Sequence, residues 1–269
     1  MPGDDHEEAS KEVEEEGQDE VEVDQEEDTQ AQEAEEEGAR SHLSSLPFGG
    51  FMGVSSFSFD ELSLELQTSR GGTLIFADPH IGFELSRGLR IRTGFERALA
   101  EFVIEKDPDL LIILGDVKEP LGISFGLKKM LIEFFSQIKE VPTVITKGNH
   151  DGRIEEATKT FKNVEVVPYL LLDDALFLHG HTQLPMVEFN EAYLGHIHPA
   201  YVFKRGETKR KVKVFVRSGK YLVLPTINPY IEGFPLEEGI RMVPFLRWTE
   251  YVDVFLPSGV YLGRINIQK

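Results

Sequence analysis

Histidine and carboxylate side chains occur in short clusters in this chain, each at the end of an apolar run. Six of the eight histidines lie in four of these clusters, and a fifth cluster contains an aspartate alone. The clusters are Asp78-Pro79-His80, Gly115-Asp116, Gly148-Asn149-His150-Asp151, His179-Gly180-His181 and Gly195-His196-Ile197-His198. Carboxylate, amide and imidazole groups gathered at strand ends are the donor set of a two-metal hydrolytic site.

The spacing within the clusters suits metal binding. Asp78 and His80 stand two residues apart, so on an extended chain both side chains point to the same side, and His196 and His198 repeat this spacing. Asp116 has two carboxylate oxygens and can bridge two cations. The mixed nitrogen and oxygen set suits Mn, Fe, Zn, Co or Ni better than Ca. Two cations ~4 Å apart lower the pKa of a shared water and hold both oxygens of an in-line displacement at phosphorus.

Each cluster taken alone has an ordinary explanation. A single histidine such as His80 is usually a surface or core residue, and Asn149-His150 could belong to a turn. We interpret the five clusters as one site because each follows an apolar run that predicts a buried strand.

The apolar runs alternate with helical patterns in the first part of the chain. Strands are expected at 62–66, 73–77, 110–114 and 143–146. Helices are expected at 93–106, 127–139 and 154–161, the first of them capped by Thr93 with Glu96 three residues later. The later pattern predicts short strands at 164–167, 175–178, 192–194, 201–204, 212–216, 221–224, 252–255 and 260–267. This order predicts one α/β domain of two mixed sheets with helices outside.

Charge divides the chain into parts. Residues 1–40 contain 19 acidic and two basic residues, so they hold −17 of the net charge of −19. This segment has no aromatic residue, and we expect a disordered acidic tail, followed by a linker at 41–55 and a folded domain at 56–269. The tail either keeps the protein soluble or binds basic partners, including the basic hairpin of the same chain.

Other sequence features bear on the compartment and the partners of the protein. The chain has no cysteine, no basic and apolar leader, and no apolar stretch of ~18 residues, so we expect a cytoplasmic protein without a membrane partner. A homodimer is possible. The apolar segment 225–250 could be a lid, a dimer surface or part of the core.

The order D-x-H, GD, GNHD, H-G-H and G-H-x-H across residues 70–200 resembles the calcineurin-like metallophosphoesterase superfamily. The segments ADPHIGFELSRG, ILGDVKE and YLGHIHPA are similar to archaeal SbcD-related phosphoesterases. The resemblance implies a four-layer αββα sandwich and two divalent ions. We expect Mn²⁺, with Fe, Zn, Co or Ni as alternatives. One ion would be held by Asp78, His80, Asp116 and His198, and the other by Asp116, Asn149, His179 and His196.

The resemblance also implies roles for residues that do not bind the ions. His150 would protonate the leaving oxygen or neutralise charge, oriented by Asp151 or another acid. His181 would support the metal ligands from outside, face the substrate, or only pack against neighbouring side chains. The chain departs from the family pattern at Pro79, where relatives usually have an aliphatic residue. It also lacks the acid that follows GD in several branches. Glu119 is the candidate substitute for that acid.

A basic segment follows the last histidine cluster. Residues 203–220 carry a net charge of +7 and predict a hairpin that turns at Gly206-Glu207-Thr208. One interpretation is an arm that follows nucleic-acid phosphates, with Lys209, Arg210 and Lys211 as substrate contacts. The other is an edge hairpin that lysines keep soluble.

These features favour a metal-dependent phosphoesterase that hydrolyses phosphodiester bonds through a two-metal-activated hydroxide, with DNA or RNA as substrate. One alternative is a phosphodiesterase acting on small molecules such as cyclic nucleotides. Another is a catalytically inactive scaffold of the same fold, which the filled ligand positions disfavour. The missing acid after GD disfavours a protein phosphatase.

Overall fold

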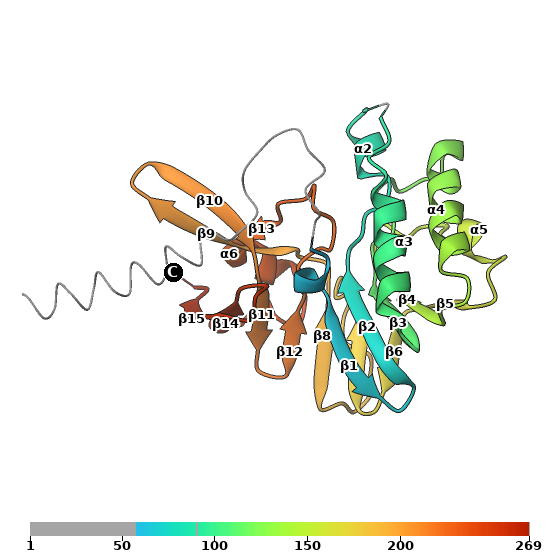
Figure 1. Ribbon diagram of the computed structural model, residues 1–269. Helices are drawn as coiled ribbons and strands as arrows, with labels where there is room; N and C mark the ends of the chain where they lie inside the picture. Colours follow the sequence, from blue (N-terminus) through green and yellow to red (C-terminus); the bar gives the residue numbers. More distant parts are fainter. Residues whose placement is uncertain (1–57, 90, 269) are drawn as a thin grey trace, which may run out of the picture. The chain divides into compact units, whose positions relative to one another are not determined.

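The computed structural model describes residues 58–89 and 91–268 (Figure 1). The predicted acidic tail and the predicted linker therefore lie outside the described residues. No helix within the described ranges is long and apolar enough to cross a membrane.

The first sheet has five strands in the order β1-β2-β3-β4-β5. They are β1 (Leu64–Thr68), β2 (Gly71–Ala77), β3 (Leu110–Leu114), β4 (Thr143–Thr146) and β5 (Val164–Val167). Only β1 runs antiparallel to its neighbour, and β2 to β5 are parallel. All five residues of β3 are buried, as expected for a central parallel strand covered on both faces.

Helices cover one face of this sheet (Figure 1). They are α3 (Phe95–Lys106) and α4 (Phe125–Gln137), with the short elements η1 (Asp60–Leu62), α2 (Phe83–Ser86) and α5 (Glu155–Thr158) beside them. Leu99 and Val103 of α3 and Phe134 of α4 pack against Leu111 and Ile113 of β3 in one apolar cluster.

The predicted cap of α3 is wrong by one residue. Gly94, with a φ of 74°, occupies the N-cap position and makes no side-chain cap. The Thr93 hydroxyl accepts from the N–H of Phe95 at 3.3 Å and donates to Glu84 at 3.0 Å. Thr93 therefore joins the start of α3 to α2.

The second sheet has seven strands in the order β15-β14-β11-β12-β8-β7-β6. They are β6 (Tyr169–Leu172), β7 (Ala175–Leu178), β8 (Glu191–Leu194), β11 (Phe215–Ser218), β12 (Tyr221–Val223), β14 (Tyr251–Phe255) and β15 (Tyr261–Asn266). β7, β8 and β12 are parallel, and the other pairs are antiparallel. This sheet is therefore mixed, as predicted.

A third sheet was not predicted. It consists of β9 (Pro199–Arg205), β10 (Thr208–Lys213) and β13 (Phe234–Pro235) in the order β10-β9-β13. The expected strand at 212–216 is in fact divided at Val214, because β10 joins this small sheet whereas β11 joins the seven-stranded one.

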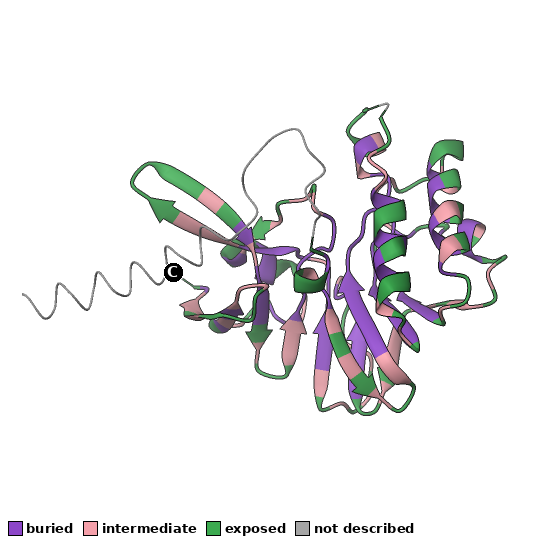
Figure 2. Ribbon diagram, in the orientation of Figure 1, coloured by how far each residue is buried: buried purple, intermediate pink, exposed green. Residues whose placement is uncertain are grey.

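The two large sheets pack face to face. Ile112 and Leu114 of β3 share a buried cluster with Phe177 and Tyr193, whose rings stack at 5.0 Å. The outer face of the seven-stranded sheet is covered by α6 (Leu236–Gly239) and η2 (Ile240–Met242) with the chain that follows them. The predicted αββα arrangement of two mixed sheets with helices outside is thus confirmed. Segment 225–250 has both buried and exposed parts (Figure 2). Its core residues include Leu236, Ile240, Val243 and Leu246.

Candidate metal centre

The predicted site residues follow the carboxyl ends of five strands. Asp78 follows β2, Asp116 follows β3, and the Asn149 cluster follows β4. His179 follows β7, and the His196 cluster follows β8. Because β2, β3 and β4 are parallel neighbours, as are β7 and β8, their carboxyl ends meet at one edge of each sheet.

Several of these loops adopt left-handed backbone conformations. The φ angles are 52° at Asp78, 44° at His80, 42° at Asp116, 77° at His196 and 42° at His198. A residue other than glycine costs about 1–3 kcal/mol in such a region, and such residues concentrate at functional sites. Five of the seven predicted ligands are held in this way.

A first group of donor atoms comprises Asp78, His80 and His198, whose donor atoms lie within 4.8 Å of one another. The Nε2 atoms of His80 and His198 are 3.0 Å apart, and Nε2 of His198 is 3.5 Å from Oδ2 of Asp78. All three residues are buried. These are the distances expected of side chains that converge on one small cation.

A second group comprises Asp116, His179 and His196. Nε2 of His179 lies 3.3 Å from Oδ2 of Asp116 and 3.1 Å from Oδ1 of Asn149. Oδ2 of Asp116 is also 3.9 Å from Nε2 of His80. Asp116 therefore lies between the two groups, in the position that a bridging carboxylate requires.

Backbone groups hold the two aspartates in place. The N–H of His196 donates to Asp78 at 2.8 Å, and the N–H of His150 donates to Asp116 at 2.8 Å. A Cβ atom at Gly148 would overlap the carboxylate of Asp116. The glycine of the GNHD motif is therefore required for this close approach.

The electrostatics of the site also suit a bound cation. Burial lowers the pKa of His196 and of His198 to about 4, so both rings are neutral near pH 7, the form that binds metals. Burial alone would lower the pKa of His179, but hydrogen bonds to Asp116 and Asp78 raise it well above its usual value. The two aspartates, with exposed fractions of 0% and 2%, thus attract positive charge into the site. The donor set fits divalent cations.

Glu119 contacts two histidines of the site. Its Oε2 atom lies 2.7 Å from Nδ1 of His80 and 3.6 Å from Nδ1 of His150, and its backbone carbonyl accepts from Nδ1 of His150 at 2.8 Å. Burial alone would lower the pKa of His80, but the hydrogen bond to Glu119 and the charges of Asp78 and Asp116 raise it. A carboxylate on the far nitrogen of a ligand histidine fixes the ring and its tautomer.

Asp151 has a different place from the expected one. Its buried carboxylate accepts from the N–H groups of Gly148 at 2.9 Å and of Val117 at 2.8 Å. It therefore joins the loop after β3 to the loop after β4. Glu119, rather than Asp151, contacts the ring of His150.

A model of the calcineurin-like phosphoesterase family matches residues 73–223, which is more than half of the chain and contains every residue of the two groups. The chain belongs to this family. It is accordingly a phosphoesterase, a hydrolase of ester bonds in a family that uses divalent metals.

The chain is also similar to a curated protein and to a solved structure. It is 30% identical over 115 residues to the SbcD subunit of the SbcCD nuclease of Staphylococcus epidermidis, an alignment covering 39% of this chain and 30% of that protein. The chain thus spans about a third of the length of this curated relative. The crystal structure of Pseudomonas putida nuclease MPE has a TM-score of 0.54 and 20% identity, covering 74% of this chain and 90% of the other. This second likeness shows the fold.

A buried lysine fastens the site loops of this phosphoesterase. Lys118 is fully buried, and its Nζ donates to the carbonyls of Pro120 at 2.6 Å, Leu121 at 3.0 Å and His150. Sequence analysis missed it because a lysine beside a glutamate is usually exposed to solvent. Its contacts explain how the loop carrying Glu119 is held against His150.

A second set of hydrogen bonds that holds a site loop was also missed; we call its residues Lys213, Thr226 and Asn228 the brace. The Thr226 hydroxyl donates to the carbonyl of Asp78 at 2.7 Å, and Nδ2 of Asn228 donates to the carbonyl of Pro79 at 2.8 Å. Nζ of Lys213 in turn donates to the carbonyls of Thr226 at 2.9 Å and of Asn228. The only sequence signal was a pair of polar residues two apart in an apolar stretch.

The remaining predicted site residues lie further from the ligand groups. The ring of His181 is 5.1 Å from that of His179 and half-buried. Lys209, Arg210 and Lys211 lie on β10, in the hairpin that begins directly after His198. They can contact a substrate only if it extends beyond the metal centre.

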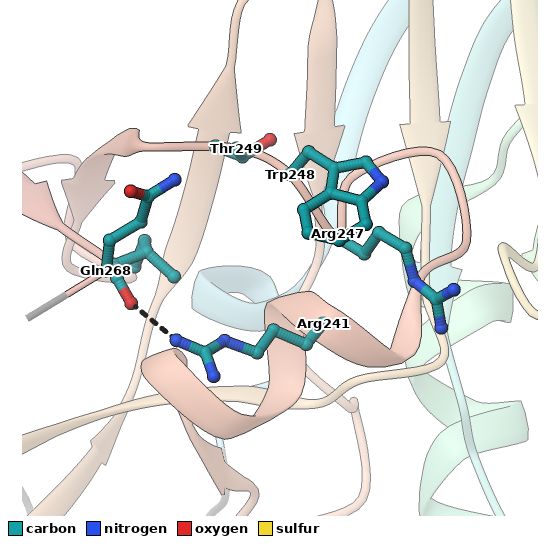
Figure 3. A pocket seen from close by; sticks show the side chains of 6 residues that line it. Arg241, Arg247, Trp248, Thr249 and Gln268 are labelled. Atoms are coloured by element: carbon teal, nitrogen blue, oxygen red, sulfur yellow. Dashed lines mark hydrogen bonds between the residues drawn. The ribbon is translucent and has the colours of Figure 1, made fainter.

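A separate cavity of about 500 Å³ lies near the end of the described chain (Figure 3). Trp248, whose side chain is 82% exposed, lies on one side of it with Arg247, and Arg241 donates to the carbonyl of Ile267 across its floor. None of the described residues that line it is a histidine or a carboxylate. The described residues that line it thus differ in chemistry from the two donor groups.

Proposed function

We propose that this phosphoesterase hydrolyses phosphodiester bonds in nucleic acid with two divalent cations, of which Mn²⁺ is our first candidate. The observation that carries the proposal is the convergence of the two donor groups around Asp116. The names of the two relatives, both nucleases, support nucleic acid over a small cyclic nucleotide as the substrate.

The proposed ligands divide into two sets that share Asp116. One cation would be held by Asp78, His80 and His198 with Asp116, and the other by His179, His196 and Asn149 with Asp116. When bound, such a pair of cations lowers the pKa of water and neutralises negative charge on the phosphate.

The chain itself would handle the proton of the leaving group. Because Nδ1 of His150 is engaged by the carbonyl of Glu119, Nε2 is the atom that can exchange a proton with the substrate. The ring of His150 is 5.3 Å from that of His80, and His80, Glu119 and His150 form a further group whose donor atoms lie within 4.8 Å of one another. In our proposal His150 lies beside the cations and is not one of their ligands. Glu119 would hold His80 and His150 at this separation.

A comparison of substrates tests the proposal. The full chain is incubated with Mn²⁺ and, in turn, with bis(p-nitrophenyl) phosphate, single-stranded DNA, RNA, a cyclic nucleotide and p-nitrophenyl phosphate. We expect hydrolysis of the diester and of at least one nucleic acid, and loss of both activities after chelation. Hydrolysis of the monoester alone, or of the cyclic nucleotide without any nucleic acid, would contradict the proposed substrate.

A further inference from the structure

The hairpin formed by β9 and β10 has one face made of lysines. In its antiparallel register Lys204 lies opposite Lys209, Val202 opposite Lys211, and Ala200 opposite Lys213. Residues directly opposite, and residues two apart along a strand, share a face of the sheet. Lys204, Lys209 and Lys211, which we call the lysine row, therefore share one face and are all exposed.

The other face of the hairpin is turned towards the protein. Tyr201, Phe203 and Arg210 on that face are all half-buried, and Tyr201 packs against the apolar cluster of the seven-stranded sheet. The ring of Tyr201 is 4.7 Å from that of Phe203. The lysine row thus remains exposed to a partner, and the exposed residues of the hairpin gather towards its turn (Figure 2).

The lysine row stores unfavourable electrostatic energy. Like charges directly opposite one another, such as those of Lys204 and Lys209, destabilise a sheet. Among the described residues, Lys204 and Lys209 have no ion-pair partner. Nζ of Lys211 is 3.8 Å from Oε2 of Glu232, whose side chain is itself largely exposed. A polyanion laid along the row would remove this repulsion.

The row also leads to the metal centre. The hairpin starts at Pro199, directly after His198, and projects from the rest of the domain (Figure 1). At the lower end of the same face, Lys213 contacts the loop of Thr226 and Asn228, which holds the backbone of Asp78 and Pro79. Lysines two residues apart on a strand are ~6.6 Å apart, a repeat comparable to that of phosphates on an extended strand.

We propose that the lysine row binds the sugar–phosphate backbone of a single nucleic-acid strand and guides it to the metal centre. This inference rests on the proposed function, because it names the surface that presents nucleic acid to the same site. A single strand is narrow enough to follow Lys209 and Lys211 along β10, with Lys204 of β9 beside Lys209.

Binding of a fluorescently labelled single-stranded oligodeoxythymidine, measured by anisotropy in the presence of a chelator, tests the proposal. The full chain is compared with the variant K204Q/K209Q/K211Q. The matched control is K139Q/K159Q/K162Q, which changes the net charge equally at exposed lysines. These control lysines precede β4 and β5, at the opposite ends of the strands from the metal centre.

We expect the lysine-row variant to bind at least ~10-fold more weakly at low salt, and its plot of log affinity against log salt concentration to be less steep by about 2, as three lost phosphate contacts predict. The control variant should bind like the wild type. The variant K204R/K209R/K211R keeps the charges and should retain binding.

Three results would overturn the inference: unchanged binding by the lysine-row variant, equal loss in the control variant, or tighter binding of a duplex of the same length through the same lysines. Hydrolysis of bis(p-nitrophenyl) phosphate by the wild type keeps the two proposals separate. If the wild type hydrolyses the diester while the lysine-row variant binds DNA normally, only the lysine row fails. If the wild type shows no hydrolysis but binding falls selectively, only the proposed chemistry fails.

Discussion

Glu119 connects the predicted ligands to the predicted proton donor. It is 2.7 Å from the ring of His80 and 3.6 Å from that of His150, and the buried Lys118 beside it fixes the course of the loop. Sequence analysis named Glu119 only as a possible substitute for a missing acid. Its contact with His80 could not be anticipated, because it depends on how the loop after β3 folds back across the loop after β2.

Substitution of Glu119 by glutamine should weaken metal binding. The carboxylate would no longer fix the tautomer of His80, and loss of such a contact costs about 10–100-fold in metal affinity. Titration of the metal-free protein with Mn²⁺, followed by calorimetry, measures this. The control is E140Q on the exposed Glu140, and equal affinities in the two variants would contradict the role given to Glu119.

Substitution of His150 by alanine should lower turnover and leave metal binding intact. His150 lies beside the predicted ligands, and loss of a general acid costs about 10²–10⁴-fold in rate. The two readouts are hydrolysis of bis(p-nitrophenyl) phosphate and the number of Mn²⁺ ions bound. A variant that loses its metals would instead show that His150 is a ligand.

At the scale of elements, apolar runs predicted some strands to the residue. β3, β4, β5 and β7 have the predicted bounds, because their runs are short and closed by turn or site residues. β6 was missed because its leucines favour strands only weakly, although the turn Asp173-Asp174, with φ angles of 51° and 61°, is typical of a two-residue hairpin. The division at Val214 depends on which sheet each half joins, which no local pattern records.

The candidate site was likewise predicted where its sequence signals are local. The seven predicted ligands were found together because each motif is local and stands at a strand end. The brace of Lys213, Thr226 and Asn228 was missed because its partners are far apart in sequence. A lysine in a basic segment suggests an exposed charge, whereas this ammonium lies among the carbonyls of a loop.

Lys213 should make stability depend on pH. Burial lowers its pKa to about 7 from 10.5, so between these values the unfolded chain binds more protons than the folded one. The free energy of unfolding should therefore rise with pH from about 7 towards 10, by at most ~1.4 kcal/mol per pH unit from this group.

Urea denaturation of the wild type and of K213M at several pH values measures this contribution. The stability difference between them should change with pH across this range, whereas the exposed control K159M should follow the wild type. Parallel pH profiles for the wild type and K213M would show that Lys213 keeps an ordinary pKa.

At the scale of the whole molecule, charge is distributed very unevenly. Residues 1–40 carry −17, whereas residues 203–220 carry +7 close behind the predicted ligand His198. We propose that these two regions attract one another, so that the acidic segment would compete with nucleic acid for the same lysines. The proposed roles of the lysine row and of the acidic segment are therefore linked.

Deletion of residues 1–40 should raise the affinity for single-stranded DNA. The effect should be clear at low salt and decrease as salt screens the charges. Anisotropy titrations of the full and the truncated chain at two salt concentrations measure it. Equal affinities at low salt would show that the acidic segment does not compete for the lysines.

The central claim is that Asp116 is shared by two divalent cations, one in each donor group. Anomalous scattering from crystals soaked in Mn²⁺ tests it most directly. We expect two peaks, one beside Asp78, His80 and His198 and the other beside Asn149, His179 and His196, each in contact with the carboxylate of Asp116. No peak at either position, or a single peak that Asp116 does not contact, would contradict the account.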